Sequence, residues 1–247
     1  MAEAQHVTID RLWPDPAADL DDDALVADIR EPVLRMNSVS SADGAATRGG
    51  LSGGLGDDAD RRYFELLRRV ADVVVVGAGT VRTEGYGPMR VSEESAAWRQ
   101  ADGLPPHPVL AIVSGSLDLD PASRIFTEAP VRPIVITTAE SDASGFADVA
   151  DVITVGHGSR IDASAAVAAL RERGFARILC EGGPTLFGAL LAADEVDELC
   201  VTIAPTLDAG GVRRIATGEI PEPRAMRLAH VLRSGSTLLV RYRREGR

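Results

Sequence analysis

Two glycine-rich segments, each directly after an apolar run, contain the residues of this chain best suited to bind a charged ligand. Residues 178–180 lead into Glu181-Gly-Gly-Pro-Thr-Leu186, and residues 72–76 lead into Gly77-Ala-Gly-Thr80. Glycines let an anionic group approach the backbone, and a helix that begins at Pro184 presents unpaired N–H groups beside it. Each segment alone is also typical of an ordinary tight turn, so only the pair favours a phosphate or ribose site.

The second glycine segment differs from the dinucleotide-binding fingerprint Gly-x-Gly-x-x-Gly. Its sixth position is Arg82, where the fingerprint has its third glycine. That glycine allows a helix to pack closely on the preceding strand, so the substitution disfavours a Rossmann dehydrogenase. A phosphate or ribose can still meet this turn.

Two carboxylates lie next to such turns and are candidates to supply or relay a proton. Asp43 is part of Ser41-Ala-Asp-Gly44, and Glu181 opens the first glycine segment. Either group could act in this way if partly buried, because burial raises a carboxyl pKa toward neutrality. For Asp43, the alternative is a plain turn former beside Gly44.

Composition limits the class of protein. The 247 residues are 45% hydrophobic and 26% charged, which is ordinary for a globular chain, and the net charge of -11 argues against a nucleic-acid surface. Cys180 and Cys200 lie in separate apolar runs, and with four scattered histidines they support neither a disulfide framework nor a zinc site. No apolar run approaches the roughly 20 residues of a membrane span, so we expect a cytoplasmic protein with no metal, membrane or nucleic-acid partner.

Apolar, strand-like runs alternate with helical patterns along most of the chain. This order predicts an α/β fold with a mainly parallel sheet and helices on both faces. The last two strand patterns are joined by Ser234-Gly-Ser236, which predicts a C-terminal antiparallel hairpin. The expected strands cover residues 33–39, 72–76, 109–113, 134–137, 152–155, 178–180, 199–203, 225–232 and 237–242.

The remaining segments define the expected domain organisation. Residues 1–30 are rich in Asp, Ala and Pro and are predicted to form an acidic extension packed on the domain, with one short helix over residues 23–29. Residues 31–247 contain no internal repeat or linker and are predicted to form a single domain. Within it, residues 45–56 form a glycine-rich loop, and Asp57 is a candidate cap for the helix that follows.

These blocks together resemble the reductase domain of bacterial riboflavin biosynthesis, the pyrimidine reductases, whose fold is like that of dihydrofolate reductase. The matching pieces occur in the family's order and cover roughly residues 33–243. They are Ser41-Ala-Asp-Gly44, Asp72 to Val81, Glu181 to Leu186, and Val196-Asp-Glu-Leu199 leading to Ile203-Ala-Pro205. Four ordered blocks are far more specific than either glycine turn alone.

The resemblance implies a reductase with NADPH as hydride donor, a dihydrofolate reductase-like three-layer fold and a homodimer. Hydride transfer needs alignment of the two reactants and one proton source but no covalent nucleophile. By family role, Asp43 and Glu181 are the catalytic candidates. The cofactor candidates are Gly79, Thr80, Val81, Arg82, Glu84, Ser114, Val155, Gly182, Gly183, Pro184, Thr185 and Leu186. The substrate candidates are Asn37, Ser52, Arg62 and Arg90.

Two departures from the family pattern leave the substrate open. The family usually has Asp-x-Pro where this chain has Thr83-Glu-Gly-Tyr-Gly-Pro88, and no His-x-Glu with Pro-Cys-x-x-Cys marks the zinc deaminase often fused ahead of the reductase. We therefore expect a stand-alone reductase acting on a pyrimidine-ribosylamine phosphate of the 5-amino-6-ribosylaminouracil type or a related pterin. The alternatives are reduction of dihydrofolate and a non-catalytic NADPH-binding protein.

Two further expectations concern the cofactor and the assembly. Arg82 or a neighbouring arginine is a candidate to pair with the 2′-phosphate and so to select NADPH over NADH. The C-terminal hairpin is the candidate contact in a homodimer.

Overall fold

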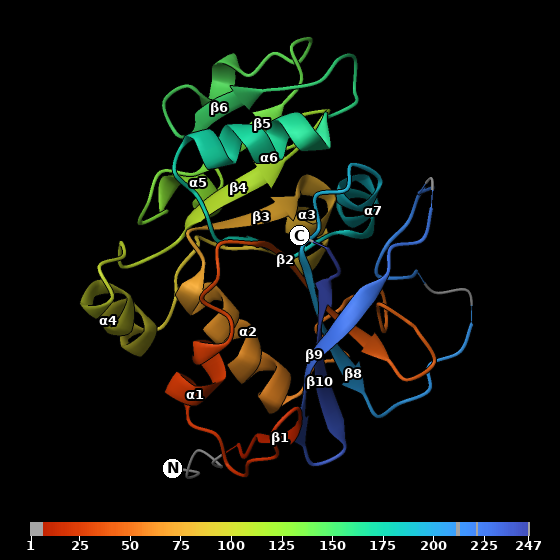
Figure 1. The fold of residues 1–247 in the computed structure, drawn as a ribbon. Helices are drawn as coiled ribbons and strands as arrows, with labels where there is room; N and C mark the ends of the chain where they lie inside the picture. The colour runs from red at the N-terminus through yellow and green to blue at the C-terminus, as the bar shows by residue number, and fades with distance from the viewer. Residues whose placement is uncertain (1–6, 211–212, 221, 247) are drawn as a thin grey trace.

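The computed structural model describes residues 7–210, 213–220 and 222–246 (Figure 1). In this part of the chain, ten strands form one sheet in the order β1-β9-β10-β8-β2-β7-β3-β4-β5-β6. Their bounds are β1 (Asp10–Trp13), β2 (Leu34–Ser41), β3 (Val73–Gly77), β4 (Val109–Val113), β5 (Ile134–Thr137), β6 (Asp151–Thr154), β7 (Ile178–Cys180), β8 (Glu198–Ala204), β9 (Met226–Ser234) and β10 (Thr237–Arg244).

All strands from β8 to β6 in this order are parallel to their neighbours. Strands β10, β9 and β1 extend the sheet antiparallel beyond β8. The central strands β3 and β5 are nearly continuous runs of buried β-branched residues, as expected where both faces of a parallel sheet are covered. The mainly parallel sheet and the antiparallel β9–β10 hairpin are therefore confirmed.

The helices are α1 (Asp22–Ala27), α2 (Asp58–Val70), α3 (Ala78–Glu84), α4 (Glu93–Ala101), α5 (Arg124–Thr127), α6 (Ala163–Glu172) and α7 (Pro184–Ala192). Local sequence fixes several of their starts. Asp57 and Asp162 cap α2 and α6 by accepting the N–H of the third residue of each helix, and Pro184 occupies the first position of α7.

Helices lie on both faces of the sheet (Figure 1), and an apolar cluster packs on each face. One cluster joins helices α1 to α3 and α5 to the sheet, with Tyr63, Leu66 and Leu67 of α2 at its centre. The other joins α6 and α7 to the opposite face through Leu170 and Phe187, among others. The expectation of helices on both faces is confirmed.

Two local expectations were wrong, and one short helix was not predicted. Residues 10–13 form β1 inside the segment expected to be an extension, because their backbone pairs with β9, a partner that lies more than 200 residues away. The segment expected to turn at Gly77-Ala-Gly-Thr80 begins α3 at Ala78, which also takes Thr83 and Glu84 into a helix. The short helix α5 carried no clear sequence signal. The division of the chain at residue 30 stays a prediction.

Candidate active site

The two glycine segments lie against each other at the carboxyl ends of β3 and β7. The Gly77 N–H donates to the Gly182 carbonyl oxygen at 2.8 Å. A Cβ on Gly183 would lie 2.4 Å from Thr80 Oγ1, so a side chain there would displace that hydroxyl. Gly182 has φ of +93°, which favours glycine, and the Gly182–Gly183 peptide is cis. The structure thus brings Thr80, Gly182 and Gly183 together.

Two helices begin at this pair of turns without a side-chain cap. Gly77 precedes α3 and Gly183 precedes α7, and neither can offer a capping oxygen from a side chain. The first N–H groups of each helix are therefore available to an anion, and the helix dipole favours negative charge there. Gly79 and Thr185 lie exposed in the first turns of these helices. This end of the sheet can therefore accept an anionic group such as a phosphate.

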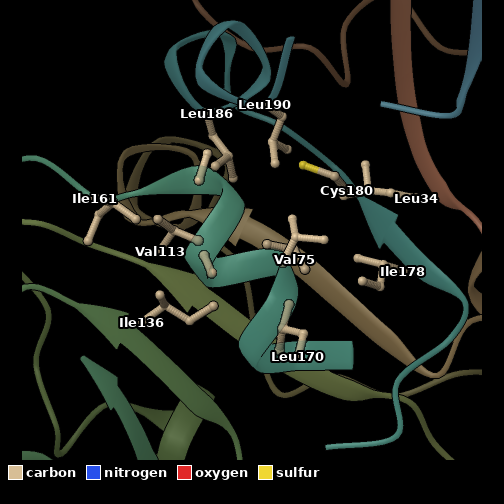
Figure 2. A pocket seen from close by; sticks show the side chains of 13 residues that line it. Leu34, Val75, Val113, Ile136, Ile161, Leu170, Ile178, Cys180, Leu186 and Leu190 are labelled. Atoms are coloured by element: carbon tan, nitrogen blue, oxygen red, sulfur yellow. The ribbon is translucent and has the colours of Figure 1, made fainter. Parts of the chain in front are cut away.

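Leu186 and Val81 turn their side chains into the core instead. Leu186 lines an apolar pocket between α6, α7 and the sheet, together with Val75 and Cys180 (Figure 2). Val81 is buried in the opposite cluster. Only their backbone groups can take part in binding at the turns.

Glu181 is the centre of a half-buried polar group beside the turns. Its carboxylate accepts two bonds from Arg68, each of 2.7 Å, and one from the Tyr86 hydroxyl at 2.7 Å. The Glu181 side chain is only 1% exposed, so the paired charge is shielded from water. Burial and then the Glu181 charge raise the pKa of Tyr86 well above its ordinary value, which keeps the hydroxyl a donor.

The pKa of Arg68 is also raised. Burial of the guanidinium opposes this shift, but the charge and hydrogen bonds of Glu181 outweigh it. Glu181 therefore holds Arg68 and Tyr86 in place at the site.

Asp43 lacks the partial burial that was expected to raise its pKa and make it a proton donor. It is exposed, and its carboxylate accepts from the Ser41 hydroxyl and from the backbone N–H groups of Asp208 and Ala209. The Ser41 hydrogen bond, followed by these two backbone bonds, lowers the Asp43 pKa to about 2. The idea that burial raises the pKa of this group was wrong, and Asp43 instead ties the turn after β2 to the segment after β8.

Three residues spaced four apart form a half-buried strip along α2, which we call the α2 stripe: Asp60, Phe64 and Arg68. The Arg68 guanidinium lies 4.3 Å from the centre of the Phe64 ring. Asp60 lies against the loop backbone at Gly56 and accepts from the Thr202 hydroxyl of β8. Burial raises the pKa of Asp60, and Thr202 opposes that shift.

Sequence reasoning missed Asp60 and Phe64. The signal available was their spacing of four, on a different side of α2 from its buried residues Tyr63, Leu66, Leu67 and Val70.

Asn37 shares the sheet face that α2 covers. In the parallel register Asn37 is opposite Cys200, and two residues later Val39 is opposite Thr202. Cys200 belongs to the cluster under α2, and Thr202 bonds Asp60. Successive strand residues alternate between faces, so Asn37 points toward the α2 side of the sheet.

The glycine-rich loop is fastened to α3. The Ser52 N–H donates to the Glu84 carboxylate at 2.9 Å, which joins a substrate candidate to a cofactor candidate. Arg48 of the same loop binds both carboxylate oxygens of Asp208, at 2.6 and 2.8 Å. These bonds hold the loop over the carboxyl edge of the sheet.

The loops after β4, β5 and β6 meet at the same edge. The Ser141 hydroxyl donates to the Gly115 carbonyl oxygen at 2.9 Å, and the Thr138 hydroxyl donates to the Gly158 carbonyl oxygen at 2.6 Å. Ser114 and Val155, the first residues after β4 and β6, are therefore part of one loop group. In open α/β sheets, ligands bind at the carboxyl ends of parallel strands.

Three arginines expected at the site are engaged elsewhere. Arg62 donates to Asp22 at 2.9 Å and to the Val7 and Leu20 carbonyl oxygens, so it fastens the N-terminal segment to α2. Its assignment to the substrate stays a prediction. Arg90 donates to the Glu128 carbonyl oxygen at 2.7 Å. The exposed Arg82 donates to the Asp118 backbone carbonyl oxygen at 2.7 Å, and the Arg82 Nε lies 3.4 Å from the Asp118 carboxylate.

Arg68, which was not among the residues expected from the sequence, is the arginine that binds Glu181 beside the glycine turns. It lies six residues beyond Arg62 on α2 and therefore on a different side of the helix.

The described residues contain neither a helix long and apolar enough to cross a membrane nor a group of three or more His, Cys, Asp or Glu side chains that could hold a metal ion. Cys180 and Cys200 are both free and buried.

Comparison with known proteins agrees with this geometry. Residues 32–240 match the family model of the RibD C-terminal domain. The chain is 28% identical over 62% of its length to the 2,5-diamino-6-ribosylamino-4(3H)-pyrimidinone 5′-phosphate reductase of Archaeoglobus fulgidus, covering 70% of that protein. It is also 28% identical to the riboflavin biosynthesis protein RibD of Mycobacterium tuberculosis, over 74% of this chain but only 45% of that protein.

A solved structure supports the same relationship. The pyrimidine reductase-like protein of Corynebacterium diphtheriae aligns with a TM-score of 0.77 and 29% identity, over 90% of this chain and 95% of that one. The family model covers most of the chain, including both glycine turns, the α2 stripe and the loop group after β4 to β6. The protein therefore belongs to the RibD C-terminal domain family, the reductase module of riboflavin biosynthesis.

Proposed function

We propose that the protein is an NADPH-dependent reductase that acts on a ribosylaminopyrimidine 5′-phosphate. The observation that carries this proposal is the contact between the two glycine turns, where two uncapped helix starts meet beside the Glu181 group. The family relationship supports the same reaction class, because its relatives include named pyrimidine 5′-phosphate reductases.

The residues at the turns fit a nicotinamide dinucleotide. The N–H groups at the starts of α3 and α7 would bind the pyrophosphate, and Gly183 leaves the room that a side chain would fill. Thr80 and Glu84 of α3 and the loop group at Ser114 and Val155 would hold the sugars and the adenine. When bound, the reduced cofactor supplies a hydride.

The substrate residues would align the acceptor for that hydride. In the ring-opened form of the ribosylamine, the sugar carbon C1′ is joined to nitrogen by a double bond. Reduction at C1′ would require the hydride that the bound cofactor supplies and one proton for the nitrogen, from solvent or a nearby group. Such a step requires positioning above all, which the Arg68–Glu181–Tyr86 group and the Ser52–Glu84 contact can provide.

The cofactor part of the proposal is tested by calorimetric titration with NADPH. The unaltered protein should bind it, and Gly183→Val should weaken binding at least about tenfold, because the side chain enters the space at Thr80. Gly145→Ala is the matched control, since a Cβ there meets Pro121 only at an ordinary distance of 3.7 Å. No binding of NADPH by the unaltered protein would overturn the assignment.

The preference for NADPH over NADH is part of the same proposal. Arg82 is exposed and already donates to the Asp118 carbonyl oxygen, so it would have to turn from that loop to reach a 2′-phosphate. Titration of the unaltered protein and of Arg82→Ala with both cofactors tests this. Equal affinities for the two cofactors in the unaltered protein would contradict the preference.

We also propose that the protein acts in the cytoplasm as a homodimer. Free, buried cysteines are usual in a reducing compartment, and family resemblance suggests the dimer. Val201, Ile203 and Leu238 form a half-buried apolar row on one face of β8 and β10, which suits a second copy. Light scattering at micromolar concentration should give twice the chain mass of 26.0 kDa. A single chain mass would contradict the dimer.

A further inference from the structure

Asp60 is a half-buried carboxylate that the proposed hydride transfer does not employ. Among the described residues, no cation forms a salt bridge with Asp60. Glu181, by contrast, pairs with Arg68, which lies eight residues after Asp60 on α2. Its hydrogen-bond partner is the Thr202 hydroxyl, and one oxygen lies next to the backbone at Gly56. A carboxylate with two oxygens accepts more bonds than this one donor supplies.

The residues around Asp60 are suited to binding a flat heterocycle. Phe64 lies one helical turn further along the α2 stripe and is half-buried, so its ring can pack against another ring. The loop that carries Ser52 and Gly56 closes the other side of the carboxylate. Asp60 therefore lies among Phe64 of the same helix, the loop backbone at Gly56 and Thr202 near the end of β8.

Two candidate pyrimidines differ at the edge that a carboxylate would meet. A 2-amino-4-oxopyrimidine offers N3–H and the 2-amino group side by side, two donors that match the two oxygens of a carboxylate. A uracil offers N3–H between two carbonyl oxygens, which a carboxylate repels. The same carboxylate therefore attracts the first ring and rejects the second.

The geometry of the α2 stripe fixes which edge meets Asp60. The ribosylamine joins the ring at C6, directly across from N3. Asp60 and Arg68 are eight residues apart, a rise of about 12 Å along the helix, and Arg68 binds Glu181 beside the glycine turns. A substrate whose sugar extends toward those turns directs its N3 edge to Asp60.

We propose that Asp60 is the residue that determines substrate specificity: its carboxylate accepts hydrogen bonds from N3–H and the 2-amino group of a 2,5-diamino-6-ribosylamino-4(3H)-pyrimidinone 5′-phosphate, with Phe64 against the ring. The enzyme accordingly rejects 5-amino-6-ribosylaminouracil 5′-phosphate. This inference rests on the proposed reductase function, and it names the substrate class of that same site.

The test compares kcat/KM for the two pyrimidines. The unaltered enzyme should prefer the 2-amino compound by roughly 100-fold or more, as sites built to bond a substrate N–H reject analogues that lack it. Asp60→Asn should reverse the preference, because an amide accepts from N3–H and donates to the neighbouring carbonyl oxygen of uracil. The matched control is Asp58→Asn, an exposed carboxylate two residues away that pairs with Arg61, and it should keep the original preference.

The outcomes separate this inference from the function beneath it. Turnover of both pyrimidines at similar kcat/KM, or a preference for the uracil, overturns the role of Asp60 and leaves the reductase standing. That comparison uses the unaltered enzyme and does not depend on the folding of a variant. A folded Asp60→Asn enzyme that keeps the 2-amino preference also overturns it. If NADPH binds but neither pyrimidine binds or reacts, the proposed function itself fails.

Discussion

The glycine turns and the α2 stripe lie at the same edge of the sheet but are built differently. At the turns, backbone atoms make the site: the Gly77 N–H donates to the Gly182 carbonyl oxygen, and a side chain on Gly183 would meet the Thr80 hydroxyl. On α2, side chains make it, with Asp60, Phe64 and Arg68 drawn from one face of a helix. We infer that the backbone-built half is suited to a constant cofactor, whereas the side-chain half can change with the substrate.

The largest expected effect concerns the link between the two halves. Glu181→Ala would leave Arg68 without its partner, and breaking a buried pair costs about 3–5 kcal/mol of unfolding free energy. Chemical denaturation measures this loss. The control is Glu195→Ala, whose partner Arg171 is 41% exposed, and it should cost less than about 1 kcal/mol. Equal losses in the two variants would show that Glu181 is no anchor.

The next largest effect is the pH dependence of stability due to His230, which contacts the buried side of α2 through Tyr63. His230 is 2% exposed, and Tyr63 Oη lies 3.2 Å from its Nε2. Burial, with the charges of Arg241 and Arg35, lowers the His230 pKa to about 3. The folded state therefore favours the neutral imidazole. The contribution of His230 to the free energy of unfolding is fully present above a pH of about 6.5 and is lost as the pH falls toward 3.

Denaturation at pH 7 and pH 4 checks this expectation. The unaltered protein should lose about 3 kcal/mol more between the two pH values than His230→Gln does. The same pH dependence in both proteins would mean that His230 does not couple α2 to the sheet in this way.

The smallest expected effect is that of Asp43→Asn, which tests whether Asp43 positions a loop or transfers a proton. The Asp43 pKa of about 2 means that this carboxylate stays ionised in the working range of pH, so it cannot donate the proton. Asp43→Asn should lower kcat only modestly, through the loosened contact with Asp208 and Ala209. The shape of the pH profile of kcat should be unchanged. Loss of one limb of that profile in the variant would restore Asp43 as an acid.

The sequence was sufficient where local chemistry determines structure. The β-branched runs of β3 and β5, the Asp57 cap of α2 and Pro184 at the start of α7 each depend on neighbours in the chain, and each was predicted. The two glycine segments were found for the same reason. Helix α3 was not predicted because its first residues, in Gly77-Ala-Gly, are typical of a turn and glycine is unfavourable inside a helix.

Contacts between distant residues could not be obtained in this way. Arg62 and Arg68 are both on α2, and only the folded chain shows that the first binds Asp22 and the second binds Glu181. Asp60 had no sequence feature that linked it to Thr202, which lies 142 residues further on. Side-chain roles at the substrate half therefore depend on tertiary packing.

The most direct test of the central claim follows the hydride itself. The protein is mixed with the 2,5-diamino-pyrimidinone ribosylamine 5′-phosphate and NADPH carrying deuterium at nicotinamide C4, on each face in turn. Our account predicts that NADPH is consumed and that, with one of the two labels, the product gains one deuterium at C1′ by mass spectrometry. Consumption of no NADPH, or a product with no deuterium from either label, would contradict the assignment of this protein as a reductase.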